Sequence, residues 1–287
     1  MGPVGRPLAD GRLHFQHGPI DLVLRGHGPG ADTAHRAAWD RFQDILTVLC
    51  DELDLLRRPL GETPPDLRGP VARRMLDACW PHRAVYLTPM AAVAGSVADE
   101  VLAAMRRAAP DLTRAFVNNG GDIALHVAGD DTLTAGLVTD LAAPALDGQI
   151  TIGARDGIGG IATSGWRGRS HSLGIADAAT VLARNAATAD AAATLIANDC
   201  TADHPAIRRL PARAVKDDSD LGDLPVTVDV GPLPPDVVAA ALARGAARAE
   251  QLRRDGHIVA ASLALQGRFR IIGPLALPAH REHVACR

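Results

Sequence analysis

Residues 115–128 read Ala115-Phe116-Val117-Asn118-Asn119-Gly120-Gly121-Asp122-Ile123-Ala124-Leu125-His126-Val127-Ala128. Two largely apolar runs flank an Asn-Asn-Gly-Gly centre, and Asn and Gly tolerate the positive φ angles that a tight hairpin turn needs. The stretch therefore predicts a strand, a tight turn and a second strand, within a region that we expect to be mostly sheet up to about Ser164.

Apolar periodicity and turn signals outward from this hairpin predict further elements on both sides. We expect strands at 13–16, 20–24, 133–138, 149–154, 159–163, 177–183, 226–230, 257–265 and 269–272. We expect helices at 33–58, 71–78, 188–197 and 235–254, with Thr188 as an N-cap, and a further helix through about 108 that follows the small-residue stretch 90–97. Helices and strands intersperse without strict βαβ alternation, which favours a mixed α/β fold, one domain spanning 1–287, with 203–224 as a polar loop.

Composition excludes several classes of protein. The chain has 287 residues, 47% of them hydrophobic, so it has enough apolar material for a full core. A net charge of -3 and 3% aromatic residues argue against a basic or base-stacking nucleic-acid binder. The cysteines, at positions 50, 79, 200 and 286, form no Cys-x-x-Cys pair, so neither a zinc site nor a disulfide framework is expected. No signal peptide or membrane span is evident, and we expect a cytoplasmic protein with no membrane partner.

Two segments carry oxygen ligands or a flexible backbone. Asp190 and Thr194 lie four residues apart, so on a helix they share a face and offer a carboxylate and a hydroxyl to Mg²⁺. The alternative is an Asp favoured by the helix dipole and a solvent-facing Thr. Gly120 and Gly121 would let the backbone approach a flat or phosphorylated ligand, although a simple hairpin turn explains them equally.

Two other segments combine small, hydroxyl and charged residues. Thr163-Ser164-Gly165 ends a predicted strand and is followed by Arg167, Arg169 and His171. The two arginines could hold a phosphate and the histidine could act as acid or base, or the segment is a solvated basic loop. Segment 91–99 is rich in small residues and ends in Asp99, which predicts either ligand access or a tightly packed helix start. The sequence contains no Gly-x-Ser-x-Gly elbow, so a serine hydrolase is not supported.

Taken in order along the chain, segments 91–99, 117–123, 161–165 and 189–194 resemble the ApbE-like family, whose best-known members are FAD:protein FMN transferases. His17-Gly18-Pro19 and Ser170-His171-Ser172 look more like an uncharacterised cytoplasmic branch of that family. The resemblance implies a T-fold-type α/β domain with a mixed sheet and packed helices that binds FAD or FMN.

The resemblance also implies roles for individual residues. Mg²⁺ would be held by Asp190, Thr194 and the main-chain carbonyl of Ala91, and would assist transfer of FMN to a Ser or Thr of an acceptor protein. His171 would lie close to the flavin or phosphate, and Asp99 would transfer a proton or orient the metal shell. The flavin-binding residues would be Asn118, Asn119, Gly120, Gly121, Asp122, Thr163, Ser164, Gly165, Arg167 and Arg169.

Two departures from the family pattern leave alternatives open. Ala94 stands where the family has a Lys. The family's His-Ile-Asp-Pro pattern is replaced here by His171-Ser172-Leu173-Gly174. Loss of the Lys removes a cation that could pair with phosphate. The function is therefore a Mg²⁺-dependent FMN transferase or FAD pyrophosphatase, a flavin-dependent oxidoreductase acting on a small anionic metabolite, or a non-catalytic flavin carrier. A homodimer is the expected assembly on general frequency.

Overall fold

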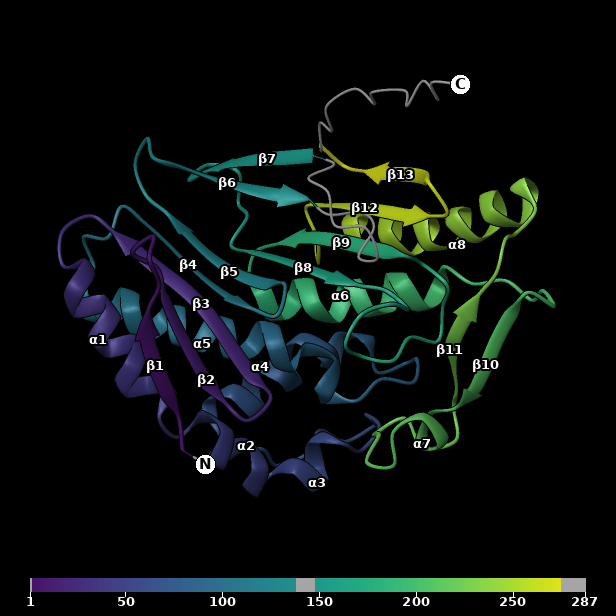
Figure 1. Cartoon of the computed structure of the whole chain (residues 1–287), viewed down its shortest axis with the longest axis horizontal. Helices are drawn as coiled ribbons and strands as arrows, with labels where there is room; N and C mark the ends of the chain where they lie inside the picture. Colours follow the sequence, from purple (N-terminus) through teal and green to yellow (C-terminus); the bar gives the residue numbers. More distant parts are fainter. Residues whose placement is uncertain (1, 138–147, 275–287) are drawn as a thin grey trace.

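The computed structural model describes residues 2–137 and 148–274. Its centre is a nine-stranded sheet in the order β1-β2-β3-β4-β5-β8-β9-β12-β13, so the strands follow one another across the sheet as they do along the chain (Figure 1). Every neighbouring pair is antiparallel. The strands are β1 (Val4–Pro7), β2 (Leu13–His17), β3 (Ile20–His27), β4 (Arg114–Asn119), β5 (Asp122–Val127), β8 (Gly160–Ser164), β9 (Ala178–Ala183), β12 (Ala260–Leu265) and β13 (Arg268–Ile272).

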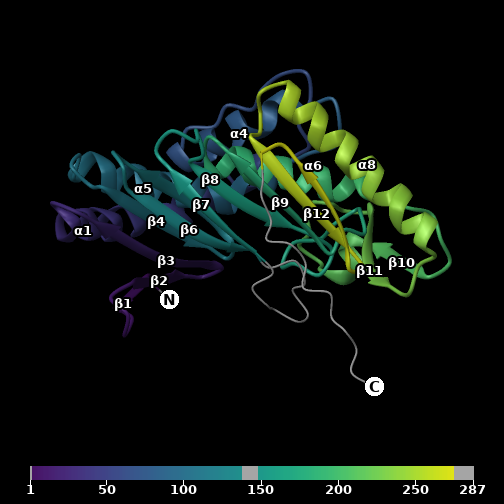
Figure 2. The same ribbon diagram turned by 90° about the horizontal axis from the view of Figure 1, so that it is seen from above.

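The helices cover one face of this sheet (Figure 2). They are α1 (Ala31–Phe42), α2 (Ile45–Asp51), α3 (Leu53–Leu56), α4 (Pro70–Cys79), α5 (Val93–Ala108), α6 (Ala186–Asp199), α7 (Ala212–Val215) and α8 (Pro235–Arg254), with 3-10 turns η1 (Trp80–His82) and η2 (Pro89–Ala92). Helix α5 packs on β4 and β5, α6 on β8 and β9, and α8 on β12 and β13. In the described ranges no helix is long and apolar enough to cross a membrane.

Strand β9 shows why the middle of the sheet is buried on both sides. Successive side chains of a strand point to opposite faces. Val181 joins the core formed with α6 and α8, whereas Leu182 joins an apolar cluster on the other face. That second cluster includes Ile152 of a separate two-stranded ribbon, β6 (Thr132–Leu137) with β7 (Gly148–Gly153). The ribbon therefore covers the central part of the sheet face that the helices leave open.

The predicted fold class is confirmed, and so is the hairpin at 115–128. Asn118 pairs with Ile123 and Asn119 with Asp122, and the turn residues Gly120 and Gly121 have φ angles of 65° and 116°. The sheet differs from the expected mixed sheet in that every neighbouring pair of its strands is antiparallel. The other predicted strands are present within a few residues, except that Val138 lies outside the described residues.

The predicted helix at 33–58 is wrong in its continuity. Its apolar face is buried as expected, with Phe42, Ile45 and Leu56 in the core. The chain nevertheless divides into α1, α2 and α3, and the second break falls at Glu52. The Glu52 carboxylate accepts hydrogen bonds from the backbone N–H groups of Arg68 and Gly69. This partner lies outside the helix, so periodicity does not reveal the break.

Two boundaries also differ from the prediction. Helix α6 begins at Ala186, and its N-cap is Asn185 rather than Thr188, because the Asn185 side chain accepts a hydrogen bond from the Thr188 N–H at 2.8 Å. The expected polar loop at 203–224 contains strand β10 (Ile207–Pro211) and helix α7. Strand β10 is mostly exposed and pairs only with β11 (Pro225–Val230), so its polar composition hid the strand signal.

Candidate functional site

The first turns of α5 and α6 lie against each other (Figure 1). A Cβ atom added to Gly95 would approach the carbonyl oxygen of Ala186 to 2.3 Å, so only glycine permits this contact. Asp99 of α5 accepts hydrogen bonds from the N–H groups of Ala186 and Ala187 at 3.0 and 2.8 Å. Asp190 of α6 accepts one from the Gly95 N–H at 3.0 Å. Each carboxylate thus satisfies unpaired donors at the start of the other helix.

Asp122 brings a second carboxylate toward Asp190. It is the first residue of β5, and it accepts a hydrogen bond from the Thr163 N–H of β8 at 3.3 Å. Burial raises the pKa of Asp122 to about 7. Burial and then repulsion by Asp122 raise the pKa of Asp190 well above its ordinary value. Since two carboxylates facing each other disfavour double ionisation, the pair favours either a shared proton or a cation.

The glycine-pair turn is tied to the start of α5. Asn119 is buried and donates a hydrogen bond to the Ala94 carbonyl at 3.1 Å. Its side-chain oxygen accepts a hydrogen bond from the Asp21 N–H at 3.4 Å. Asn118 closes the turn itself by accepting from the Gly121 N–H. These bonds, together with those of Asp122 and Asp190, join all four motif segments in one place.

The two arginines of the 165–171 segment have different surroundings. Arg169 lies 3.3 Å from the position of a Cβ on Gly120, and it donates to the Pro19 carbonyl at 3.4 Å. It forms no ion pair within residues 2–137 and 148–274. Arg167 instead stacks over Trp166 and lies 3.6 Å from the Asp177 carboxylate. The structure therefore places Arg169 beside the glycine-pair turn and Arg167 in a separate cluster with Asp177.

Two more predicted residues lie on the same segment. His171 is half-buried, and its Nε2 is buried without a hydrogen-bond partner among the described residues. Gly165 follows Ser164 at the end of β8, and a Cβ there would meet the Asp177 carbonyl oxygen at 2.4 Å. The glycine therefore serves close backbone packing, and the His171 Nε2 remains a buried polar atom without a partner in the described ranges.

The predicted magnesium ligands come from two elements. Thr194 is one turn beyond Asp190 on α6, and Ala91 lies in η2, immediately before α5. No set of three or more His, Cys, Asp or Glu side chains in the described part of the chain is placed to hold a metal ion. The donor set that the resemblance predicts, a carboxylate, a hydroxyl and a carbonyl oxygen, would suit a hard cation.

Sequence reasoning missed a contact beside η2. Thr88 is buried and donates a hydrogen bond to the Asp220 carboxylate at 2.5 Å, and Tyr86 donates to the Asp220 carbonyl at 3.0 Å. Asp220 belongs to the segment predicted as a solvated polar loop. The two partners of the Thr88 bond are 132 positions apart in the chain, and no local pattern points to it.

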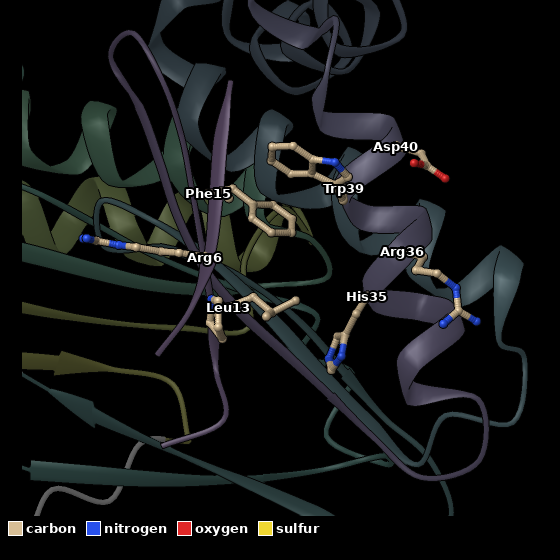
Figure 3. Close-up of a pocket in the computed structure, with 9 residues that line it drawn as sticks. Arg6, Leu13, Phe15, His35, Arg36, Trp39 and Asp40 are labelled. Atoms are coloured by element: carbon tan, nitrogen blue, oxygen red, sulfur yellow. The ribbon is translucent and has the colours of Figure 1, made fainter. Parts of the chain in front are cut away.

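A separate groove lies between the first two strands and α1 (Figure 3). It has a volume of about 520 Å³ and is lined by Gly5, Arg6, Pro7, Leu13, Phe15, His35, Arg36, Trp39 and Asp40. Trp39 points from α1 toward Phe15, whereas Asp40 points outward. None of these residues belongs to the four motif segments. The chemistry-bearing residues and this hollow are therefore different places on the molecule.

The convergence of the four segments agrees with a family match. The model of the family described as AbpE bacteria matches residues 6–271, most of the chain. The chain belongs to this family. The resemblance drawn from the motifs is therefore confirmed, and the matched range contains every residue assigned to the candidate site.

One curated relative and several solved structures are similar to this AbpE bacteria family member. A UPF0280 protein of Methanothrix thermoacetophila is 38% identical over 127 residues, 44% of this chain and 50% of the relative. The chain spans about half the length of that relative. The apo flavinyl transferase ApbE of Pseudomonas stutzeri is 15% identical with a TM-score of 0.43, over 94% of this chain and 93% of that one. The ApbE protein of Thermotoga maritima is 14% identical with a TM-score of 0.47, over 93% and 96%.

Proposed function

We propose that this AbpE bacteria family member binds FAD, cleaves its pyrophosphate with the help of Mg²⁺, and passes FMN to a Ser or Thr hydroxyl of an acceptor protein. The reaction class comes from the family resemblance. The observation that supports this reaction for the present chain is that the four motif segments meet in space. Three hydrogen bonds join them: Asn119 to Ala94, Gly95 to Asp190 and Thr163 to Asp122. Residues scattered over about a hundred positions thereby form one polar corner.

The residues fit Mg²⁺ by their charge and donor chemistry. Asp190 and Asp122 repel each other, and a cation bound at Asp190 would offset the repulsion that contributes to the raised Asp190 pKa. We assign Asp190, Thr194 and the Ala91 carbonyl as ligands. When bound there, Mg²⁺ would neutralise charge on the pyrophosphate. Asp99 acts as a positioning residue, because both of its oxygens accept N–H groups of α6, the helix that carries the ligands.

The chain's own groups account for the remaining steps. Arg169 pairs with an anionic part of the nucleotide beside the glycine-pair turn, where it has no carboxylate partner in the described ranges. The acceptor hydroxyl oxygen forms a bond to the phosphorus on the FMN side, and the bond to the AMP phosphate breaks. AMP leaves with the electron pair. The hydroxyl proton passes to the unpartnered nitrogen of His171.

The test is incubation of metal-free protein with FAD, with and without Mg²⁺, followed by chromatography of the nucleotides. The expected result is AMP release that needs Mg²⁺, with FMN found free or attached to protein. FAD retained intact at one equivalent would refute the transferase and favour a flavin-dependent oxidoreductase or a flavin carrier. A chain that binds no FAD at all would refute the flavin assignment.

A further inference from the structure

Two histidines meet where the turn after α4 lies beside the turn after α8. His82 ends η1, directly after α4, and His257 lies in the turn between α8 and β12. Their ring centroids are 4.8 Å apart and the ring planes are inclined by 72°. The two histidines are 175 positions apart in the chain. The tertiary fold therefore brings them together, and no local sequence preference does.

The His82 ring is neutral and incompletely satisfied. Its Nε2 is buried without a hydrogen-bond partner in the described part of the molecule. A buried polar atom without a partner is uncommon in folded proteins and needs an explanation, and an absent ion is one such explanation. Burial, followed by the nearby His257 and Arg248, lowers the pKa of His82 to about 4, so at neutral pH the ring carries one proton and its other nitrogen keeps a free lone pair.

Among the charged groups near His82, His257 and Arg248 act on its pKa more strongly than Asp255 does, and Arg248 is itself engaged in an ion pair. Arg248 is the nearby guanidinium, and it is paired with the Asp199 carboxylate at 2.6 Å. Asp255 follows α8 and acts on His82 as a negative charge. A hollow of about 480 Å³ is lined by the two chain neighbours of His82, Pro81 and Arg83, and by Glu62. The segment that carries His82 is therefore open to solvent on one side.

We propose that His82 and His257 form a binding site for a first-row transition-metal ion of the Zn²⁺ type, separate from the candidate flavin site. Imidazole nitrogen is a preferred ligand of Zn²⁺, Ni²⁺ and Cu²⁺, whereas Mg²⁺ prefers oxygen. Each ring supplies one nitrogen, and water oxygens complete the shell. The ion joins the turn after α4 to the turn after α8. It thereby ties the α4 and α8 ends of the helical layer together without taking part in the flavin chemistry.

The test uses the full chain after removal of metal with a chelator. Zn²⁺ is titrated calorimetrically into the wild type, His82→Gln and His257→Gln, each in excess Mg²⁺. His27→Gln is the matched control, because His27 is also half-buried but lies at the end of β3. We expect one Zn²⁺ per chain in the wild type and the control, at least tenfold weaker binding in both site variants, and a Zn²⁺-dependent rise in Tm only where the pair is intact.

Two outcomes would overturn the proposal. The first is the absence of saturable Zn²⁺ binding to the wild type. The second is binding that neither substitution weakens, which would place the ion elsewhere. Far-ultraviolet circular dichroism checks the fold of each variant, and His257→Gln keeps the test decisive if His82→Gln fails to fold. The titration involves no flavin, so its result is independent of the proposed transferase activity.

Discussion

Asp99 and Asp190 cap each other's helices. Asp99 is on α5 and binds the first N–H groups of α6, and Asp190 is on α6 and binds the first turn of α5. The two helices therefore cannot separate without leaving backbone donors unsatisfied at both ends of the contact. Asp190 thereby has a structural task in addition to the proposed metal task, and the two can be separated by substitution.

Asp190→Asn should separate the cap from the metal site. The amide oxygen still accepts the Gly95 N–H, but the charge that holds Mg²⁺ is gone. We expect Mg²⁺-dependent AMP release from FAD to fall at least ~100-fold, while the free energy of unfolding does not decrease, because the Gly95 N–H keeps its partner and a carboxyl group with a raised pKa is removed. Asp190→Ala should lose both the hydrogen bond to the Gly95 N–H and the Mg²⁺-dependent activity. Equal activity in Asp190→Asn and wild type, measured by chromatography, would remove Asp190 from the metal site.

Asp99→Asn should destabilise the fold. Its amide nitrogen cannot accept the second of the two α6 N–H groups, so one buried donor loses its partner. We expect a loss of about 1–3 kcal/mol in the free energy of unfolding by urea. Asp32→Asn, in the first turn of α1, is the matched control, since Asp32 makes no side-chain cap bond. An unchanged unfolding midpoint for Asp99→Asn would contradict the capping assignment.

The raised carboxyl pKa values predict a stability that falls with pH. The folded-state pKa values of Asp99 and Asp122, about 6 and about 7, exceed the unfolded value of 3.8. The folded state therefore binds more protons between pH 4 and 7, and rising pH favours unfolding over that window. Asp122→Asn should flatten the profile and gain about 1 kcal/mol at pH 7.5 relative to wild type. Urea unfolding at several pH values, without Mg²⁺, measures this; parallel profiles would refute it.

Gly95→Ala should push α5 and α6 apart. The added Cβ meets backbone atoms of α6 at 2.3 to 2.8 Å, and backbone cannot move aside as a flexible side chain can. We expect a loss of about 2–3 kcal/mol in unfolding free energy. Gly61→Ala is the control, because nothing lies within 4 Å of its added Cβ. Similar stability of the two variants would show that the helices are less closely packed than described.

Arg169→Gln and Arg167→Gln should differ in their effect on nucleotide binding. Arg169 faces the glycine-pair turn without an ion pair in the described ranges, so its loss should weaken FAD binding about tenfold. Arg167 is engaged by Asp177 and Trp166, and its loss should leave FAD affinity within about twofold. Fluorescence titration with FAD distinguishes them. If Arg167→Gln weakened FAD binding more than Arg169→Gln, the assignment of nucleotide binding to Arg169 rather than Arg167 would be wrong.

The parts of the fold that sequence predicts are those with local causes. The Asn118–Gly121 turn needs positive φ angles at two adjacent residues, Gly120 and Gly121. Four consecutive residue types, Asn-Asn-Gly-Gly, are enough to predict it. The break at Glu52 and the Thr88–Asp220 bond depend on partners elsewhere in the chain, which periodicity cannot contain. For the candidate site, residue types and order were predictable. The capping by Asp99 was not, because its partners are 87 and 88 positions away.

The order of the strands across the sheet has a consequence for how the chain tolerates change. Neighbouring strands β5 and β8 are separated in sequence by the β6–β7 ribbon, and β9 and β12 by a segment that contains the β10–β11 ribbon. Both excursions leave the sheet and return to the next free edge, so neither disturbs the register of the strands that follow. The connections within these two excursions can therefore change in length without shifting the strands of the sheet, provided that buried side chains such as Ile152 and Val230 keep their contacts.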